Sequence, residues 1–209
     1  MTELAAIKHT NLFATPLLAH RWSDGPELNE ELRERILAEE QGTAGESKTN
    51  VGGWHSEAGQ LEFCGDAGRR LILHMYEMAD EATRRVLTEY GQAARPMRWT
   101  LHAWANINRA GDFNRTHTHP GSTWSGTYYV DPGEPPDDAE HGTPIHLFDP
   151  CQGRANTFLP PLIPSSILIR PEAGLMILFP SYLPHTVFAH RGRRPRISIA
   201  FNLRKEPFP

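Results

Sequence analysis

From residue 96 onward, the chain consists of short segments in which apolar and polar residues alternate, separated by turns rich in proline and glycine. Alternation with a period of two places one set of side chains on each face of a β-strand. So many short strands predict a double-sheet jelly roll, also called a double-stranded β-helix. The expected strands are 99–107, 125–130, 143–148, 166–170, 175–179, 185–190 and 196–203.

The first 95 residues have helical spacing instead. Leu28, Leu32 and Ile36 recur every four residues in the segment 26–40. This spacing puts the three side chains on one face of a helix. The segment 66–90 has the same periodicity over a greater length. The sequence therefore predicts two amphipathic helices before the strands begin.

Composition indicates an ordinary globular chain. Hydrophobic residues make up 39% and the formal net charge is −4, which favours neither disorder nor nucleic-acid binding. No apolar run approaches the roughly 18 residues needed to span a membrane, and the first 20 residues lack a secretory-signal pattern. Cys64 and Cys151 form neither a disulfide framework nor a zinc motif. We expect a cytoplasmic α+β protein, mainly β, with a single domain over residues 1–209, in which a helical support region (1–95) packs on one sheet of a jelly-roll core (96–209).

Three histidines stand at positions suited to one metal ion. His117 and His119 are two residues apart in a segment that leads into a strand, so both side chains can point the same way. His185 follows a proline-containing turn at the start of another strand. A metal requires imidazole lone pairs that converge on one centre. Two histidines in H-x-H spacing are a weak signal alone, but two strand-borne segments suit the mouth of a jelly roll.

Arg196 and Ser198 add a candidate anion site. They alternate with Ile197 and Ile199 along one strand, so they share the face opposite the apolar one. A guanidinium binds a carboxylate through two hydrogen bonds, and an adjacent hydroxyl donates one more. If Arg196 is buried, it should meet an anion, because a buried arginine without one is costly; the alternative is an exposed arginine at the start of a strand.

Together these segments resemble the Fe(II)/2-oxoglutarate oxygenase superfamily, whose pattern is His-x-Asp/Glu, a distal His and then an Arg, often in Arg-x-Ser. More narrowly, the chain is similar to a bacterial group of 2OG-Fe(II) oxygenases without established substrates. The resemblance covers nearly the whole chain, and its specificity lies in the combination of motifs. The motifs are FATPL at 13–17, GW at 53–54, NIN at 106–108, Gly111, HTHPG at 117–121, SGTYYV at 125–130, FDP at 148–150, PSYLPH at 180–185 and RISIAFN at 196–202.

The resemblance implies a reaction and a cofactor site. The chain would hydroxylate an unknown small-molecule or peptide substrate with O2 and 2-oxoglutarate, releasing succinate and CO2. Arg196, helped by Ser198, would bind the distal carboxylate of 2-oxoglutarate. Tyr129 matches a tyrosine that reaches the same carboxylate in prolyl-hydroxylase-like relatives. Asn106 or Asn108 would line the pocket from the neighbouring strand.

The resemblance also implies that His117 and His185 bind the iron, and the chain departs from the family at the third ligand. The superfamily has an acidic residue where this chain has His119, and the usual site consists of two histidines and one carboxylate. Three histidines would leave the ferrous site one unit more positive. Two interpretations remain open: His119 is the third ligand, or it lines the pocket while water or a carboxylate from Asp112 or Asp149 completes the coordination.

Two other functions fit parts of the pattern. A cupin-like metalloenzyme, such as a thiol dioxygenase or an isomerase, would use three histidines without 2-oxoglutarate, but it would leave Arg196 and Ser198 unexplained. A non-catalytic jelly roll could instead bind a metal or another ligand. We expect the loops at 131–142 and 153–164 to form the substrate side of the pocket, and the exposed helices would permit a homodimer.

Overall fold

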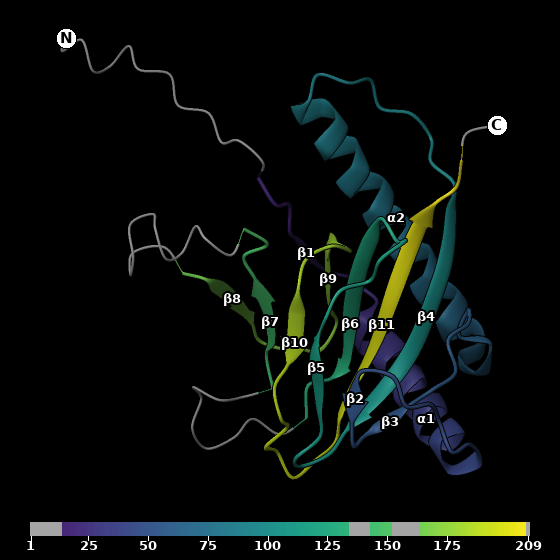
Figure 1. Cartoon of the computed structure of the whole chain (residues 1–209). Helices are drawn as coiled ribbons and strands as arrows, with labels where there is room; N and C mark the ends of the chain where they lie inside the picture. Colours follow the sequence, from purple (N-terminus) through teal and green to yellow (C-terminus); the bar gives the residue numbers. More distant parts are fainter. Residues whose placement is uncertain (1–13, 134–142, 152–163, 208–209) are drawn as a thin grey trace.

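The computed structural model describes residues 14–133, 143–151 and 164–207, which form two facing antiparallel sheets and two helices (Figure 1). The six-stranded sheet has the order β1 (Leu18–Arg21), β9 (Leu175–Pro180), β6 (Trp124–Asp131), β11 (Arg196–Lys205), β4 (Trp99–Asn108) and β3 (Trp54–His55). The five-stranded sheet has the order β2 (Asn50–Val51), β5 (Phe113–His117), β10 (His185–Val187), β7 (Ile145–Phe148) and β8 (Ser166–Ile169). This arrangement confirms the predicted mainly-β α+β jelly roll.

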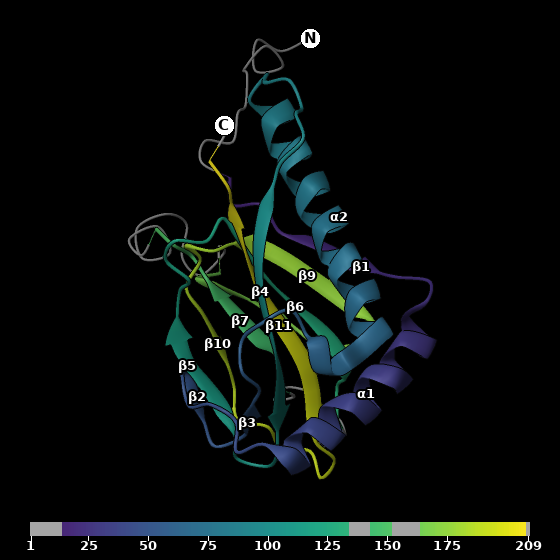
Figure 2. The same ribbon diagram turned by 90° about the vertical axis from the view of Figure 1, so that its right-hand side faces the viewer.

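Both predicted helices are present and cover the outer face of the six-stranded sheet (Figure 2). Helix α1 spans Gly25–Gly42, with a proline in its first turn, and α2 spans Gly65–Glu89, directly after the short 3-10 helix Glu62–Cys64. The helical periodicity of the sequence corresponds to a buried apolar stripe on each helix. None of the described helices combines the length and the apolar character that crossing a bilayer would need.

Strand β4 shows how the sequence separates the core from the cavity. Its alternate residues Leu101, Ala103 and Ala105 are buried against the helices. Trp104 and Asn106, which lie between them, line a cavity on the opposite face of the sheet. The period-two pattern therefore assigns one face of the sheet to the core and the other to the candidate site.

Three short strands lie in the region for which the sequence predicted helices. Strand β1 pairs with β9, β2 pairs with β5, and β3 pairs with β4. Segments of two to four residues are too short to show a period, so their pairing is determined by the neighbouring strands. The predicted loops at 131–142 and 153–164 lie largely outside the described residues.

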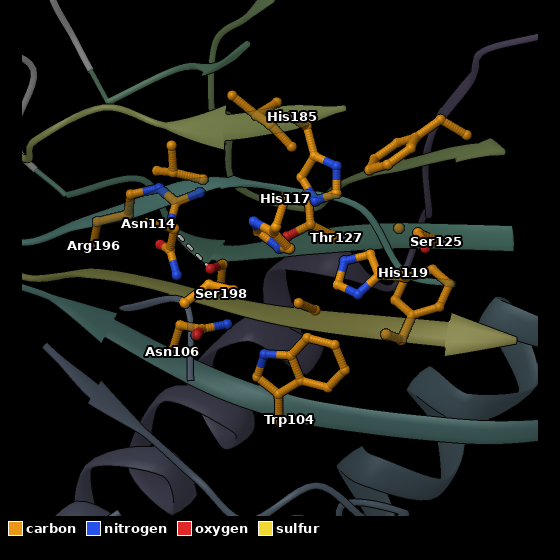
Figure 3. Close-up of a pocket in the computed structure, with 17 residues that line it drawn as sticks. Trp104, Asn106, Asn114, His117, His119, Ser125, Thr127, His185, Arg196 and Ser198 are labelled. Atoms are coloured by element: carbon orange, nitrogen blue, oxygen red, sulfur yellow. Dashed lines mark hydrogen bonds between the residues drawn. The ribbon is translucent and has the colours of Figure 1, made fainter. Parts of the chain in front are cut away.

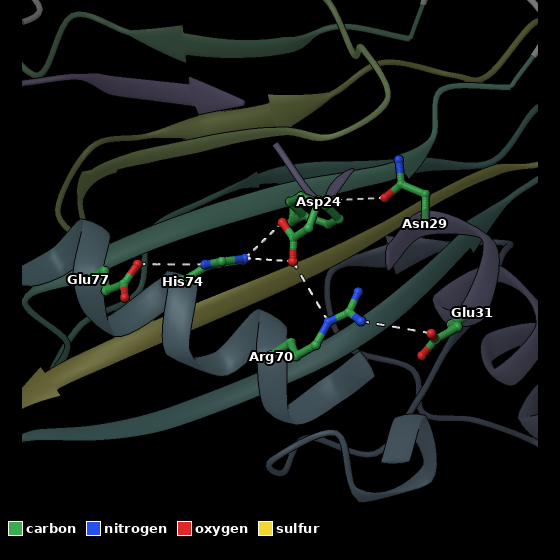
Figure 4. A network of polar contacts seen from close by, with 7 residues as sticks. Asp24, Asn29, Glu31, Arg70, His74 and Glu77 are labelled. Carbon is green, nitrogen blue, oxygen red and sulfur yellow. Dashed lines mark hydrogen bonds and ion pairs between the residues drawn. The ribbon is translucent and has the colours of Figure 1, made fainter. Parts of the chain in front are cut away.

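A polar network joins the N-terminus of α1 to α2 (Figure 4). The imidazole Nε2 of His74 lies 3.1 Å from Oδ1 of Asp24, and the Nε of Arg70 lies 3.7 Å from Oδ2 of the same carboxylate. The ring of Trp22 stacks on the ring of His74 at a centroid distance of 3.9 Å. These contacts fix the helices to each other on the side of the sheet that faces away from the cavity.

Candidate metal and carboxylate site

Three histidines converge in the cavity between the sheets (Figure 3). His117, the last residue of β5, pairs directly with His185, the first residue of β10, and His119 follows shortly after β5 ends. One ring nitrogen from each histidine lies within 4.8 Å of the other two. No acidic residue of the described ranges belongs to this cluster, and Asp112 and Asp149 are among the residues that lie outside it. The predicted convergence of the three imidazoles is therefore present.

Backbone carbonyls orient two of the rings. The Nδ1 of His117 lies 2.7 Å from the carbonyl oxygen of Arg115, and the Nδ1 of His185 lies 2.9 Å from that of Leu183. A carbonyl oxygen can only accept a hydrogen bond, so Nδ1 of each neutral ring carries the proton. The lone pair of Nε2 is then free to bind a metal, as in most histidine metal sites.

The third ring is held differently. The side-chain amide nitrogen of Asn202 donates to Nδ1 of His119 over 3.2 Å. The hydroxyl of Ser125 in turn donates to the amide oxygen of Asn202 over 2.7 Å, across directly paired residues of β6 and β11. A side-chain amide therefore orients the ring of His119, whereas backbone carbonyls orient the rings of His117 and His185.

Burial keeps the three imidazoles neutral. It lowers the pKa of His117, and it lowers the pKa of His185 to about 4, with a further contribution from His117. Burial and the two neighbouring histidines lower the pKa of His119 to about 3. At neutral pH the three rings are therefore uncharged and do not repel a cation.

The predicted carboxylate clamp lines the same cavity. Arg196 is 2% exposed, and one of its terminal nitrogens donates to Oγ of Ser198 over 3.0 Å and to Oδ1 of Asn108 over 3.2 Å. Among the described residues, its Nε has no hydrogen-bond partner and no acidic side chain forms an ion pair with it. Burial lowers the pKa of Arg196 by penalising its positive charge. A buried, unneutralised guanidinium indicates an anionic ligand.

Tyr129 lies beside this guanidinium. It pairs with Ser198 in the β6–β11 ladder, and the central carbon of Arg196 is 5.2 Å from the centroid of its ring. Its hydroxyl is buried and has no hydrogen-bond partner among the described residues. Burial raises the pKa of Tyr129, while the guanidinium of Arg196 opposes that shift. The phenol therefore remains protonated and can donate a hydrogen bond to an anion held by Arg196.

The structure also identifies cavity residues that the motifs did not single out. Asn106 lines the cavity as predicted, whereas the side-chain oxygen of Asn108 accepts a hydrogen bond from Arg196. Thr49 and Asn114 line it as well, and no sequence signal marks them. Asn202 has a detectable signal, because it lies on the same alternating face of β11 as the two clamp residues.

Comparisons with known proteins agree with this geometry. Residues 102–202, the segment that carries the three histidines and the clamp, match a family model described as "Putative 2OG-Fe(II) oxygenase". No curated protein matches the sequence.

Several solved structures share the fold. A prolyl-4-hydroxylase from Pseudomonas putida is 15% identical, with a TM-score of 0.63, over 92% of this chain and 94% of that one. A prolyl hydroxylase from Trichoplax adhaerens, in complex with a peptide fragment, is 14% identical, with a TM-score of 0.59, over 90% and 82%. HygX from Streptomyces hygroscopicus, with nickel and 2-oxoglutarate bound, is 15% identical, with a TM-score of 0.55, over 93% and 84%. At these identities the structures establish a common fold, and the family match adds the segment that carries the site. Residues 102–202 are therefore similar to the 2OG-Fe(II) oxygenase family, and the chain shares the fold of these solved structures.

Proposed function

We propose that His117, His119 and His185 bind Fe(II), that Arg196 binds 2-oxoglutarate, and that the enzyme hydroxylates a substrate in the same cavity. The observation that carries this proposal is the position of Arg196, a buried guanidinium with no acidic partner among the described residues, on the wall of the cavity that holds the three histidines. A ligand with a carboxylate at one end and metal-binding oxygens at the other would satisfy both groups at once.

Each residue around the clamp has a defined task. Ser198 and Asn108 fix the guanidinium of Arg196 by accepting hydrogen bonds from it. The hydroxyl of Tyr129 is available to the same carboxylate, and Asn106 adds a polar side chain to the cavity wall. Iron together with 2-oxoglutarate and O2 supplies the oxidising chemistry towards a C–H bond, with succinate and CO2 as products.

A three-histidine site would be one unit more positive than the usual site of two histidines and one carboxylate, because neutral imidazoles leave both positive charges of Fe(II) uncompensated. The two carboxylates of 2-oxoglutarate would offset two of the three positive charges carried by the iron and the guanidinium of Arg196. His119 belongs to the histidine cluster and no acidic residue of the described ranges does. We therefore propose that His119 takes the ligand position that an acidic residue has elsewhere in the superfamily.

The remaining cavity wall supports a substrate with an uncharged reacting part. Arg196 is the one charged side chain among the described residues that line the cavity, and Trp104, Thr49 and Asn114 belong to the same lining. The ring of His55 stacks on the ring of Trp104 at a centroid distance of 5.4 Å, which restricts the rotation of the indole. Both a small molecule and a peptide present such groups.

We also propose that the enzyme acts in the cytoplasm. Both of its cysteines are free, Cys64 buried and Cys151 exposed. An exposed free thiol is typical of a reducing compartment.

The proposed function is tested by adding Fe(II) and then 2-oxoglutarate to the protein without oxygen. Chelation of the iron should produce a weak visible metal-to-ligand charge-transfer band. We expect Arg196→Ala to abolish the band at moderate 2-oxoglutarate concentrations while metal binding persists, and His185→Ala to abolish metal binding. Arg109→Ala, which removes an exposed arginine paired with Glu40, is the matched control and should leave the band unchanged.

Each contrary result excludes a different part of the proposal. Bound iron without a band in the wild-type protein would exclude 2-oxoglutarate and favour the cupin-like enzyme. A protein that binds no metal would be a non-catalytic binding module.

A further inference from the structure

The three imidazoles differ in the kind of group that holds Nδ1. A backbone carbonyl holds Nδ1 of both His117 and His185, so one tautomer is imposed on each ring. His119 instead contacts the side chain of Asn202. A carboxamide has one accepting and one donating end, so rotating it by half a turn reverses its role. The side-chain amide of Asn202 can therefore face His119 in two orientations, with either its nitrogen or its oxygen towards Nδ1.

In the amide orientation that the structure shows, His119 has no lone pair available for a metal. When the Asn202 amide nitrogen donates to Nδ1, the lone pair of that atom is used in the hydrogen bond. In a neutral imidazole the proton then resides on Nε2. Neither nitrogen of His119 has a free lone pair, although the ring lies within the cluster.

The opposite setting makes His119 a ligand. After rotation, the amide oxygen of Asn202 would accept from Nδ1–H, which leaves the lone pair of Nε2 free. The rotation also turns the amide nitrogen towards Ser125, which now donates to Asn202 over 2.7 Å. Because a hydroxyl both donates and accepts, Ser125 satisfies the amide in either setting. No hydrogen bond of the chain has to be lost when the amide turns.

We propose that Asn202, together with Ser125, is a positioning pair that controls whether His119 binds the metal. In the metal-free protein the amide donates to His119, and metal binding rotates the amide so that His119 completes the three-histidine site. This inference rests on the proposed function, in that it requires a metal at His117 and His185. It explains why Asn202 and Ser125, whose side chains form no hydrogen bond to His117, His185 or Arg196 in the described structure, are hydrogen-bonded to each other beside the cavity.

The tautomer of each histidine can be observed directly. Long-range ¹H–¹⁵N correlation spectra of protein with ¹⁵N-labelled histidine, recorded without metal and with Zn²⁺ as a diamagnetic probe, distinguish a proton on Nδ1 from one on Nε2. Without metal we expect the proton on Nδ1 in His117 and His185 and on Nε2 in His119. With Zn²⁺ we expect all three rings to carry it on Nδ1. If His119 already carries the proton on Nδ1 without metal, the amide does not switch and the inference is wrong.

Variants of Asn202 test the same pair through metal affinity. Asn202→Asp supplies a partner that can only accept from Nδ1, so we expect His119 to adopt the ligand tautomer without metal and Zn²⁺ to bind about 10- to 100-fold more tightly. Asn202→Leu removes the partner and should weaken Zn²⁺ binding by a similar factor. Asn114→Asp is the charge control: it places a carboxylate on the cavity wall at a residue with no hydrogen bond to His119, and it should leave the tautomer unchanged.

The outcomes separate this inference from the proposed function. If His185→Ala abolishes Zn²⁺ binding while both Asn202 variants bind it as the wild type does, the metal site stands and the role of Asn202 is refuted. If Zn²⁺ changes the signals of His117 and His185 but the proton of His119 remains on Nε2, His119 does not bind the metal through Nε2 and the inference is wrong. If Zn²⁺ does not bind at all, both the proposed function and this inference are wrong.

Discussion

His117 and His185 occupy directly opposed positions of β5 and β10, and their rings lie 4.3 Å apart between centroids. Each ring has its Nδ1 against the carbonyl oxygen of the residue two positions earlier, Arg115 or Leu183. The backbone of two paired strands therefore determines the spacing and the tautomer of both proposed ligands. Two of the three proposed metal ligands are preorganised by backbone, and only the ring of His119 is oriented by a side chain.

The identity of the third ligand can be tested by substituting His119. His119→Asp restores the two-histidine, one-carboxylate set of the superfamily. We therefore expect it to keep Fe(II) binding and the charge-transfer band with 2-oxoglutarate, with the band shifted in energy. His119→Ala removes a donor and should weaken Fe(II) binding by at least about tenfold, on the order of 1.4 kcal/mol. Equal Fe(II) affinity in His119→Ala and the wild type would show that His119 only lines the pocket.

Tyr129 is expected to contribute to cofactor binding and not to folding. Its buried hydroxyl has no hydrogen-bond partner among the described residues, so Tyr129→Phe should leave the free energy of unfolding of the cofactor-free protein unchanged or slightly higher. The loss of a hydrogen bond to a carboxylate should weaken 2-oxoglutarate binding by about 10- to 100-fold. Titration of the charge-transfer band measures the affinity, and urea unfolding measures the stability.

The adjacent tyrosine provides a matched control. The hydroxyl of Tyr128 donates to Asn29 of α1 over 2.7 Å, on the opposite face of the same strand. Tyr128→Phe should therefore cost about 1 kcal/mol of stability and leave 2-oxoglutarate affinity unchanged. If both variants weaken 2-oxoglutarate binding equally, the effect is a general loosening of β6 and not a contact of Tyr129.

The sequence predicts the fold wherever alternation or helical spacing extends over enough residues. In β4 and β11 the pattern separates core from cavity, and both are long strands of the six-stranded sheet. It does not predict β5, whose residues Phe113–His117 are mostly polar. Strand β5 forms because its backbone pairs with β2 and β10, and a single segment carries no information about such distant partners.

In the candidate site, too, local sequence patterns can be predicted and contacts between distant residues cannot. The three histidines and the pair Arg196 and Ser198 can be named from motif spacing, because each motif is local in sequence. The hydrogen bond between Asn202 and His119 cannot be predicted in this way, because the two residues are 83 positions apart in the sequence. The choice between His119 and a distant carboxylate as third ligand likewise requires knowing which side chains the two sheets bring together.

Gly126 is required by close packing inside the six-stranded sheet. A Cβ at this position would lie 2.5 Å from the carbonyl oxygen of Ile177 and would overlap the ring of Phe201. We expect Gly126→Ala to lower the free energy of unfolding by about 1–3 kcal/mol. Gly42→Ala, at the end of α1 with no atom near the added Cβ, should instead leave the protein as stable or up to about 1 kcal/mol more stable. Comparable urea midpoints for the two variants would contradict this packing.

The metal-free protein should lose stability on acidification through its histidine cluster. The pKa of His119 is lowered to about 3 and that of His185 to about 4, each mainly by burial, from an ordinary value of 6.5. Between these values the unfolded chain binds protons that the folded chain excludes, so the unfolding free energy falls as the pH falls below about 6.5. The slope is at most about 1.4 kcal/mol per pH unit for each histidine and levels off once the folded-state pKa is reached.

Urea unfolding of the metal-free protein at a series of pH values from about 7 down to about 4 measures this slope. His119→Gln removes one titrating group from the cluster, so its stability should depend less steeply on pH than that of the wild type. Bound Zn²⁺ should carry the dependence on to lower pH, because the metal keeps protons off the rings at and below their metal-free pKa values. A stability that does not change over this range would mean that the three rings are already accessible to water and protons in the folded protein, and that burial does not keep them neutral for a metal.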